Sequence, residues 1–287
     1  MSGRKVRAIA LFELRGVVRN WAYWTLTVVY PLILSGSLLG IRASGEHLPP
    51  PPPGGPSLRA AMALGFAWMF GFPMLLLSGA FLAQATTEER ESRVGEVLLA
   101  SVRADELVLG KLSGIGAAVL LQTVLWIAPV AVALHAAAVD SASLPTAAEE
   151  LEALGILFLG SAFTASLFLT AACFGTARTA QQSVVGLLSV FANVPLLAST
   201  HALLTAPDGG VARVLSWFPF TSAMVSAYRI LAAPESIKAV ERAGVAGLLA
   251  LLTGALVRLA ARLLRVTLVS AGAPVGLRAA LRQSRLG

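Results

Sequence analysis

A stretch dense in charge lies between two long apolar runs, and this pattern restricts the fold more than any other feature. The charged stretch is Glu88–Lys111, with Ala61–Ala85 before it and Leu112–Val139 after it. A helix of about 20 apolar residues crosses the hydrocarbon core of a bilayer, so each run is long enough to span a membrane. Charged side chains are costly in lipid. The pattern therefore predicts two membrane spans joined by a segment that lies in water at the membrane surface.

The composition indicates an integral membrane protein along the whole chain. Hydrophobic residues make up 56% of the chain, and only 13% are Asp, Glu, Lys or Arg, about half the share of an ordinary soluble domain. The net charge of +7 does not indicate nucleic-acid binding, because the basic residues lie at the ends of the apolar runs and form no patch with interleaved aromatic residues. We expect an all-α protein that contacts membrane lipids and no nucleic acid.

Six apolar runs predict six transmembrane helices within a domain at 22–268. These spans are predicted at about 22–41, 61–85, 112–139, 151–174, 183–204 and 243–264. The stretch at 207–242 is too polar to span and too apolar for a free loop, so we expect an interfacial hairpin with a helix after Pro219. Residues 269–287 are predicted to form a basic tail.

The first 21 residues predict an amphipathic interface helix. Val6, Ala10, Leu14 and Val17 share one helical face. The basic residues assigned to the interface are Arg4, Arg7, Arg15 and Arg19. Such a helix suits the plane of the membrane surface, with its basic groups near anionic headgroups. A plain positive anchor for the first span and a specific docking role are both compatible with this pattern.

The charged segment at 86–111 predicts a short helix of its own. Thr86-x-x-Glu89 matches a capping box, and acidic residues near a helix N-terminus are favoured by the helix dipole. Val94, Val97 and Leu98 then fall on one face at helical spacing. Thr146-x-x-Glu149 is a second capping box and is expected to open the fourth span.

The distribution of basic residues predicts which side of the membrane the charged segment occupies. Six spans place both termini on the same side. If the charged segment lies on that side too, this side carries 16 of the 22 Lys and Arg residues, those of the segment included, and the opposite side carries six. Cytoplasmic loops carry the excess of Lys and Arg. We therefore expect cytoplasmic termini and a multi-pass protein of the plasma membrane, such as a bacterial inner membrane.

The sequence carries no recognisable catalytic motif. It contains no HExxH pair and no GxSxG elbow, and Gly110-Lys111-Leu112-Ser113 lacks the spacing of a phosphate-binding loop. Intramembrane acidic residues, which ion-coupled carriers use, are not found well inside the predicted spans. We expect no enzyme activity, no metal and no cofactor in this chain. A membrane enzyme or a proton-coupled carrier that acts without an ATPase is the alternative interpretation.

The charged segment resembles the loop between the second and third spans of type-2 ABC transporter permeases. The resemblance is carried by Glu89-Arg90-Glu91-Ser92-Arg93, by Glu96-Val97-Leu98-Leu99 and by Glu106-Leu107-x-Leu109-Gly110-Lys111. The N-terminal helix and Trp217–Ser222 with Arg229 are similar to the family's interface helix and to its hairpin before the last span. Val102 stands where many members have proline, and Gly95 where a larger apolar residue is common.

This resemblance implies six spans, a cytoplasmic coupling helix and a role as the permease subunit of an ABC exporter. The residues it implies for coupling to the ATPase are Glu88, Glu89, Arg90, Glu91, Arg93, Glu96 and Leu98. The implied partners are an ABC ATP-binding subunit, which binds ATP and Mg²⁺, and a second permease chain in a homodimer or heterodimer. Drug-, lipid- and ion-like substrates all fit, and no substrate-binding residue is indicated.

Overall fold

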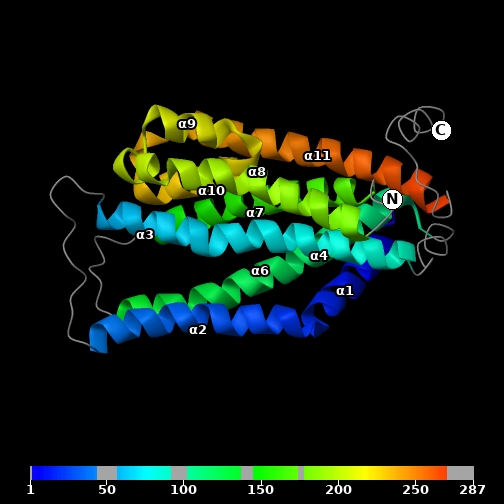
Figure 1. The fold of residues 1–287 in the computed structure, drawn as a ribbon, viewed down its shortest axis with the longest axis horizontal. Helices are drawn as coiled ribbons and strands as arrows, with labels where there is room; N and C mark the ends of the chain where they lie inside the picture. Colours follow the sequence, from blue (N-terminus) through cyan, green and yellow to red (C-terminus); the bar gives the residue numbers. More distant parts are fainter. Residues whose placement is uncertain (1, 44–56, 92–101, 137–144, 174–177, 270–287) are drawn as a thin grey trace.

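The computed structural model describes residues 2–43, 57–91, 102–136, 145–173 and 178–269, and the regular structure in these ranges is helical throughout (Figure 1). The helices are α1 (Gly3–Arg19), α2 (Trp21–Ala43), α3 (Leu58–Phe66), α4 (Phe72–Glu91), α6 (Ala104–Ala136), α7 (Ala147–Ala172), α8 (Arg178–Thr205), α9 (Gly210–Trp217), α10 (Pro219–Ala232) and α11 (Ala239–Val269). A π-helical turn, Ala67–Gly71, joins α3 to α4, and a 3-10 turn, Pro234–Ser236, precedes α11.

Four helical segments of the described residues are long and apolar enough to cross a membrane. They are Arg59–Thr86, Ala104–Ile127, Ala147–Ala172 and Ala239–Leu264. A shorter apolar stretch, Tyr23–Ile33, lies in α2. Helices α2 and α8 lie over the first and fifth predicted spans, so a helix covers each of the six. The all-α class is confirmed, and the count of six spans stays a prediction.

The long helices run side by side along the long axis of the molecule (Figure 1). The beginning of α1 and the end of α11 lie at the same end of this bundle, together with the end of α4 and the beginning of α6. We call this the junction end. We call the opposite end, where α9 and α10 turn back on each other, the hairpin end.

Helix α10 lies in the core of the bundle. Every residue from Thr221 to Leu231 is buried. Pro219 occupies the start of the helix, where its missing N–H leaves no helical hydrogen bond unmade. Gly160 of α7 allows the close approach of α10, because a Cβ at this position would collide with Ala223. The helix predicted after Pro219 is therefore present, and it packs inside the protein.

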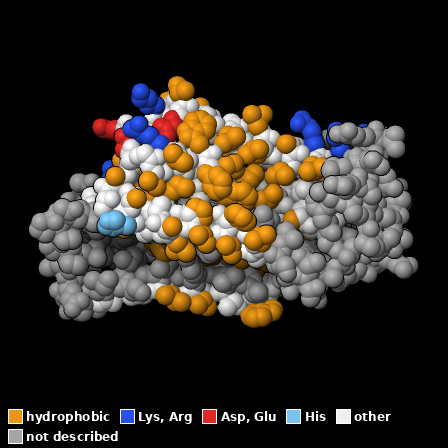
Figure 2. Space-filling model, turned by 45° about the horizontal axis from the view of Figure 1, so that its top comes forward, with side chains coloured by type: hydrophobic (Ala, Val, Ile, Leu, Met, Phe, Trp, Pro, Cys, Tyr) orange, Lys and Arg blue, Asp and Glu red, His pale blue; other side chains and the backbone are white. Residues whose placement is uncertain are grey.

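The surface separates apolar from charged side chains as a membrane protein requires. Figure 2 shows hydrophobic side chains over the middle of the visible face and charged side chains toward its two ends. Helices α2 and α8 also expose large apolar side chains, among them Leu32 and Ile33 on α2 and Phe191 and Leu197 on α8. Soluble monomers rarely expose apolar patches of this extent, whereas lipid covers them at no cost.

The prediction that Thr86 caps the start of a separate helix is wrong, whereas 92–101, where the rest of that helix is predicted, lie outside the described residues. Helix α4 continues through Thr86 to Glu91, and the Thr86 hydroxyl donates a hydrogen bond of 2.8 Å to the Leu82 carbonyl. A hydroxyl that bonds the carbonyl four residues earlier belongs to a helix interior, whereas a cap accepts from N–H groups that follow it. The second membrane helix therefore extends into the segment at 86–111.

The other end of this segment is also helical. Helix α6 begins at Ala104, eight residues before the predicted start of the third span at Leu112. The capping box at the start of α7 is confirmed: Thr146 Oγ1 accepts from the Glu149 N–H at 3.3 Å, and the Thr146 N–H donates to Glu149 Oε2 at 2.8 Å. The described ends of α4 and α6 thus leave 92–103 between the two helices.

Candidate functional site

The residues predicted to couple to an ATPase lie between α4 and α6, at the junction end. The backbone of Glu88, Glu89, Arg90 and Glu91 forms the end of α4. Arg93, Glu96 and Leu98 lie outside the described residues. What the structure adds is how the two flanking helices are held, because both run directly from this segment into the bundle.

Two glycines bring α1 against the first turns of α6. A Cβ on Gly110 would lie 2.6 Å from the Cβ of Ile9, and one on Gly114 would lie 2.8 Å from the Cβ of Glu13. Both separations are too short for real side chains, so only glycine fits. The Gly-x-x-x-Gly spacing places both residues on one face of α6 and allows close approach of the two helices. We call this contact the α1–α6 junction.

A buried ion pair closes the α1–α6 junction. Lys111 Nζ donates a hydrogen bond of 2.7 Å to Glu13 Oε1, and the side chains are 0% and 7% exposed respectively. Glu13 is the only acidic residue of α1. Removing one partner of a buried pair leaves an uncompensated charge and costs about 3–5 kcal/mol. The pair therefore fixes the register of α1 on α6.

Glu106 holds the beginnings of both helices. Its Oε1 accepts from the Ser2 N–H, just before α1, and its Oε2 accepts from the Arg103 N–H at 3.3 Å, just before α6. The Glu106 side chain is buried. An acidic residue in the first turn of a helix is favoured by the helix dipole. One carboxylate thus joins the start of α1 to Arg103, the residue just before α6.

Sequence reasoning missed this junction. Gly110-Lys111-Leu112-Ser113, which lacks the spacing of a phosphate-binding loop, lies inside α6, where Ser113 Oγ donates to the Leu109 carbonyl at 2.8 Å. Two signals could have indicated the junction: the Gly110-x-x-x-Gly114 spacing and a single glutamate within a basic helix. Neither signal predicts that Glu13 pairs with Lys111, because the two residues are far apart in the chain.

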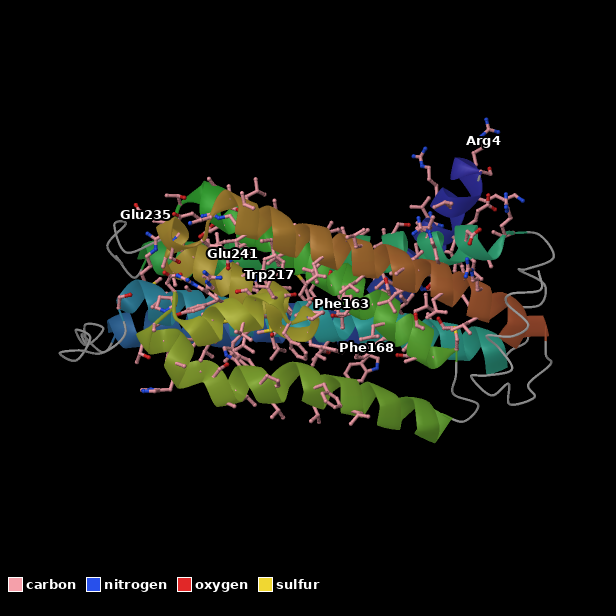
Figure 3. All side chains as sticks on the ribbon, turned by 90° about the horizontal axis from the view of Figure 1, so that it is seen from above. Arg4, Phe163, Phe168, Trp217, Glu235 and Glu241 are labelled. Carbon is pink, nitrogen blue, oxygen red and sulfur yellow. The ribbon has the colours of Figure 1, made fainter. Side chains whose placement is uncertain are left out.

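The predicted interface arginines lie on the other side of α1. Arg4, Arg7, Arg15 and Arg19 are exposed, whereas Val17 is buried. Figure 3 shows α1 projecting from the side of the bundle, with Arg4 near its tip. The predicted division of α1 into an apolar and a basic face is present, and α6 covers the apolar face.

A second group of ionic contacts lies at the hairpin end. The Arg229 side chain is fully buried in α10. It donates to Ser216 Oγ at 3.1 Å and to Asp208 Oδ1 at 3.3 Å, and it pairs with Glu241. Asp208 also pairs with the exposed Arg213 at 3.0 Å. The Arg213 guanidinium, hydrogen-bonded to Asp208, lowers the pKa of that carboxyl.

Two further arginines secure the end of α10 and the turn that follows. Arg59 pairs with Glu149 at 2.6 Å and donates to the Leu231 carbonyl at 2.8 Å. Arg242 pairs with Glu152 at 2.6 Å and donates to carbonyls of the turn before α11. Two glutamates at the start of α7, Glu149 and Glu152, therefore bind arginines at this end. Within the described residues, no three His, Cys, Asp or Glu residues gather as metal ligands.

A family model described as an ABC-2 family transporter protein matches residues 50–262, which comprise α3 to α10 and most of α11. The chain belongs to the ABC-2 transporter family. This ABC-2 protein is thus a membrane component of an ABC transporter, and the four long apolar helices among its described residues support a multi-pass membrane protein. The matched residues include Lys111 and both glycines of the α1–α6 junction, whereas α1 and α2 precede them.

The ABC-2 protein is also similar to an uncharacterized protein of Methanocaldococcus jannaschii. The two are 28% identical over 166 residues, which are 58% of this chain and 40% of the relative. The match therefore covers less than half of the relative's length.

Proposed function

We propose that this ABC-2 protein is the permease subunit of an ATP-driven exporter. Two permease chains, identical or different, form the transporter with separate ABC ATP-binding subunits that bind ATP and Mg²⁺. Closure of the ATPase dimer moves the segment at 86–111 and shifts the spans between inward- and outward-facing arrangements. The cargo is a drug-, lipid- or ion-like substrate.

The observation that carries this proposal is the direct helical connection on both sides of the charged segment. On one side, α4 extends from the apolar span to Glu91 without a break. On the other side, α6 begins at Ala104 and is tied to α1 by Glu106 and by the Lys111–Glu13 pair. A displacement of the segment would therefore act on two membrane helices and on α1 together.

The charge distribution supports a cytoplasmic junction end in the plasma membrane. At this end the arginines of α1 are exposed, and its one glutamate is buried. At the hairpin end, four arginines pair with acidic residues. They are Arg59, Arg213, Arg229 and Arg242. The unbalanced positive charge thus lies at the junction end, as expected for the cytoplasmic side.

Charge reversal in the coupling segment tests the proposal. Glu89→Arg together with Glu96→Arg is expected to weaken co-purification with the ATPase and export strongly, because reversal places like charges against the partner, whereas loss of an exposed pair alone costs little affinity. The control is Glu235→Arg, which reverses an exposed carboxylate at the hairpin end (Figure 3). Unchanged association and export in the double variant would contradict the proposal. Full activity of the chain alone would instead favour a membrane enzyme or a proton-coupled carrier.

A further inference from the structure

Helix α2 packs mainly on α6, and the contact between them carries polar side chains. The two helices lie side by side and run toward the hairpin end (Figure 1). Tyr23 of α2 is buried, and its hydroxyl donates a hydrogen bond of 3.0 Å to the Ala118 carbonyl of α6. Because the helices run in the same direction, the residues that follow rise in step, so that 23–35 of α2 accompany 118–130 of α6. We call this contact the α2–α6 seam.

The side of α2 that faces the seam is more polar than the side that faces outward. Among the described side chains of α2, the buried ones follow one another at one per helical turn, and they are Tyr23, Thr27, Pro31 and Ser35. The large exposed side chains of the same stretch are apolar, and they include Val28, Val29, Leu32 and Ile33. Helix α2 therefore turns a row of hydroxyl groups toward α6 and hydrocarbon toward its surroundings.

Gln122 of α6, one turn beyond Ala118, carries an open hydrogen-bond donor in this seam. The Gln122 side chain is 3% exposed, and within the described residues its Nε2 donates to no acceptor. Ser35 Oγ is likewise buried without a partner there, whereas Thr27 Oγ1 donates to the Tyr23 carbonyl at 2.6 Å. A buried donor without a partner costs about 1–3 kcal/mol, and hydrocarbon offers no acceptor. The open donor therefore points to a ligand that brings an acceptor into the seam.

The residues of the seam define the chemistry of this ligand. Neither 23–35 nor 118–130 contains Asp, Glu, Lys, Arg or His. A charged group would stay uncompensated at this depth, which is costly, whereas hydroxyl, ester or amide oxygens can accept from Gln122 and exchange hydrogen bonds with Ser35. Exposed apolar side chains flank the seam on α6 as they do on α2, among them Leu121 and Val124. An uncharged polar head that carries hydrocarbon chains matches both features.

We propose that the α2–α6 seam takes up the uncharged polar head of an amphipathic, lipid-like molecule, whose hydrocarbon chains stay in the bilayer beside the two helices. Gln122 Nε2 donates to an oxygen of the head, and Ser35 supplies a second hydrogen bond nearer the hairpin end. This inference rests on the proposed function, because it names the class of cargo and the residues that the cargo meets. Entry of the head needs no ATPase, so the seam and the permease assignment can fail independently.

A lipid with a reactive head tests whether head groups enter the seam. The full chain in nanodiscs carries Thr27→Cys in a Cys173→Ala background, because Cys173 is the one cysteine of the chain and is buried. The probe is a diacylglycerol whose head carries a maleimide, and the mass of the intact protein reports its attachment. Val28→Cys is the matched control, since Val28 lies at the same depth but is 48% exposed. We expect much faster labelling at position 27 than at position 28, and Trp21→Cys at the exposed corner of α2 is the positive control.

Substitution of Gln122 separates a role in binding from a role in packing. In the Thr27→Cys background, Gln122→Leu removes the open donor and should slow labelling about three- to tenfold, the worth of one hydrogen bond. The same variant should unfold at an unchanged or higher temperature, because it leaves no buried donor without a partner. Thr123→Val is the control: it removes a neighbouring buried hydroxyl that already donates to the Val119 carbonyl at 2.8 Å, and labelling should stay unchanged.

Two further reagents test the class of ligand. A phosphatidylethanolamine with a maleimide on its head carries a charged phosphate and should label position 27 more slowly than the diacylglycerol does, relative to Trp21→Cys. Faster labelling by a charged, water-soluble maleimide would assign the seam to a water-borne cargo and overturn the inference. Equal labelling of positions 27 and 28 would also overturn it. So would unchanged labelling or a lowered thermal midpoint in Gln122→Leu, because either result would make the amide a packing residue.

Discussion

Lys111 Nζ lies 2.7 Å from Glu13 Oε1, and this buried pair joins α6 to α1. Lys111 lies between Gly110 and Gly114 in the sequence, the two glycines at which α6 approaches α1 most closely. The pair holds these two helices, which are distant in the sequence, against each other at the junction end.

Breaking this pair is expected to destabilise the protein strongly. Glu13→Leu or Lys111→Met alone should lower the free energy of unfolding by about 3–5 kcal/mol, because each leaves one buried charge without its partner. Combining Glu13→Leu with Lys111→Met should recover most of that loss, since an apolar pair of similar volume needs no compensation. Denaturation of the purified chain in detergent measures both effects. A double variant that is as unstable as the sum of the singles would contradict the pairing.

Adding a single methyl group at either glycine of the α1–α6 junction should destabilise the folded protein. Gly114→Ala should destabilise the chain, because the added Cβ meets the Ala10 backbone and Glu13. Gly247→Ala on α11 is the control, since no atom lies within 4 Å of a Cβ at that position. In a helix interior alanine is favoured over glycine by about 1 kcal/mol, so the control should be neutral or stabilised. The thermal midpoint of Gly114→Ala should therefore fall, whereas that of Gly247→Ala should stay unchanged or rise. An unchanged or raised midpoint in Gly114→Ala would refute the close contact.

The two arginines that share Asp208 should differ in their contribution to stability. Arg229 is fully buried, whereas the Arg213 side chain is 59% exposed. Arg229→Met leaves Asp208 and Glu241 without their buried partner and should cost about 3–5 kcal/mol. Arg213→Met removes an exposed pair and should cost at most about 1 kcal/mol. Thermal unfolding of both variants in detergent gives the comparison, and equal losses would show that the buried cluster is not the stronger one.

The contribution of the Asp208 carboxylate to the stability of the folded state should disappear in acid. Arg213 and Arg229 lower the pKa of this carboxyl below its ordinary value of 3.8. A lowered pKa stabilises the folded state at pH values above the ordinary pKa, and the contribution is lost as the pH falls through the lowered value. Asp208→Asn should therefore be less stable than the unaltered chain at neutral pH and equally stable at sufficiently low pH. A difference that persists unchanged in acid would contradict the charge pairing.

Local signals in the sequence predicted the local structure well. The face formed by Val6, Ala10, Leu14 and Val17 predicted α1, because apolar periodicity reflects burial directly. The start of α7 followed from its capping box, and Pro219 marked the start of α10. Each of these features depends on contacts within a few residues.

The errors and omissions arose where local and long-range interactions compete. Thr86 and Glu89 have the spacing of a cap, but no helix-breaking residue precedes them, so the hydroxyl bonds Leu82 and the helix continues. The Glu13–Lys111 pair joins two segments that no local pattern connects. The burial of α10 likewise depends on small residues of α7, such as Gly160, that lie elsewhere in the chain.

The most direct test of the account is site-specific photo-crosslinking in membranes that contain the complete transporter. A photoreactive side chain replaces Glu96 in the segment between α4 and α6, and the matched position is Glu235 at the hairpin end (Figure 3). The account predicts a crosslink to the ABC ATP-binding subunit from position 96, which changes in yield on ATP binding, and none from position 235. No crosslink from position 96, or an ATPase crosslink from position 235, would contradict it.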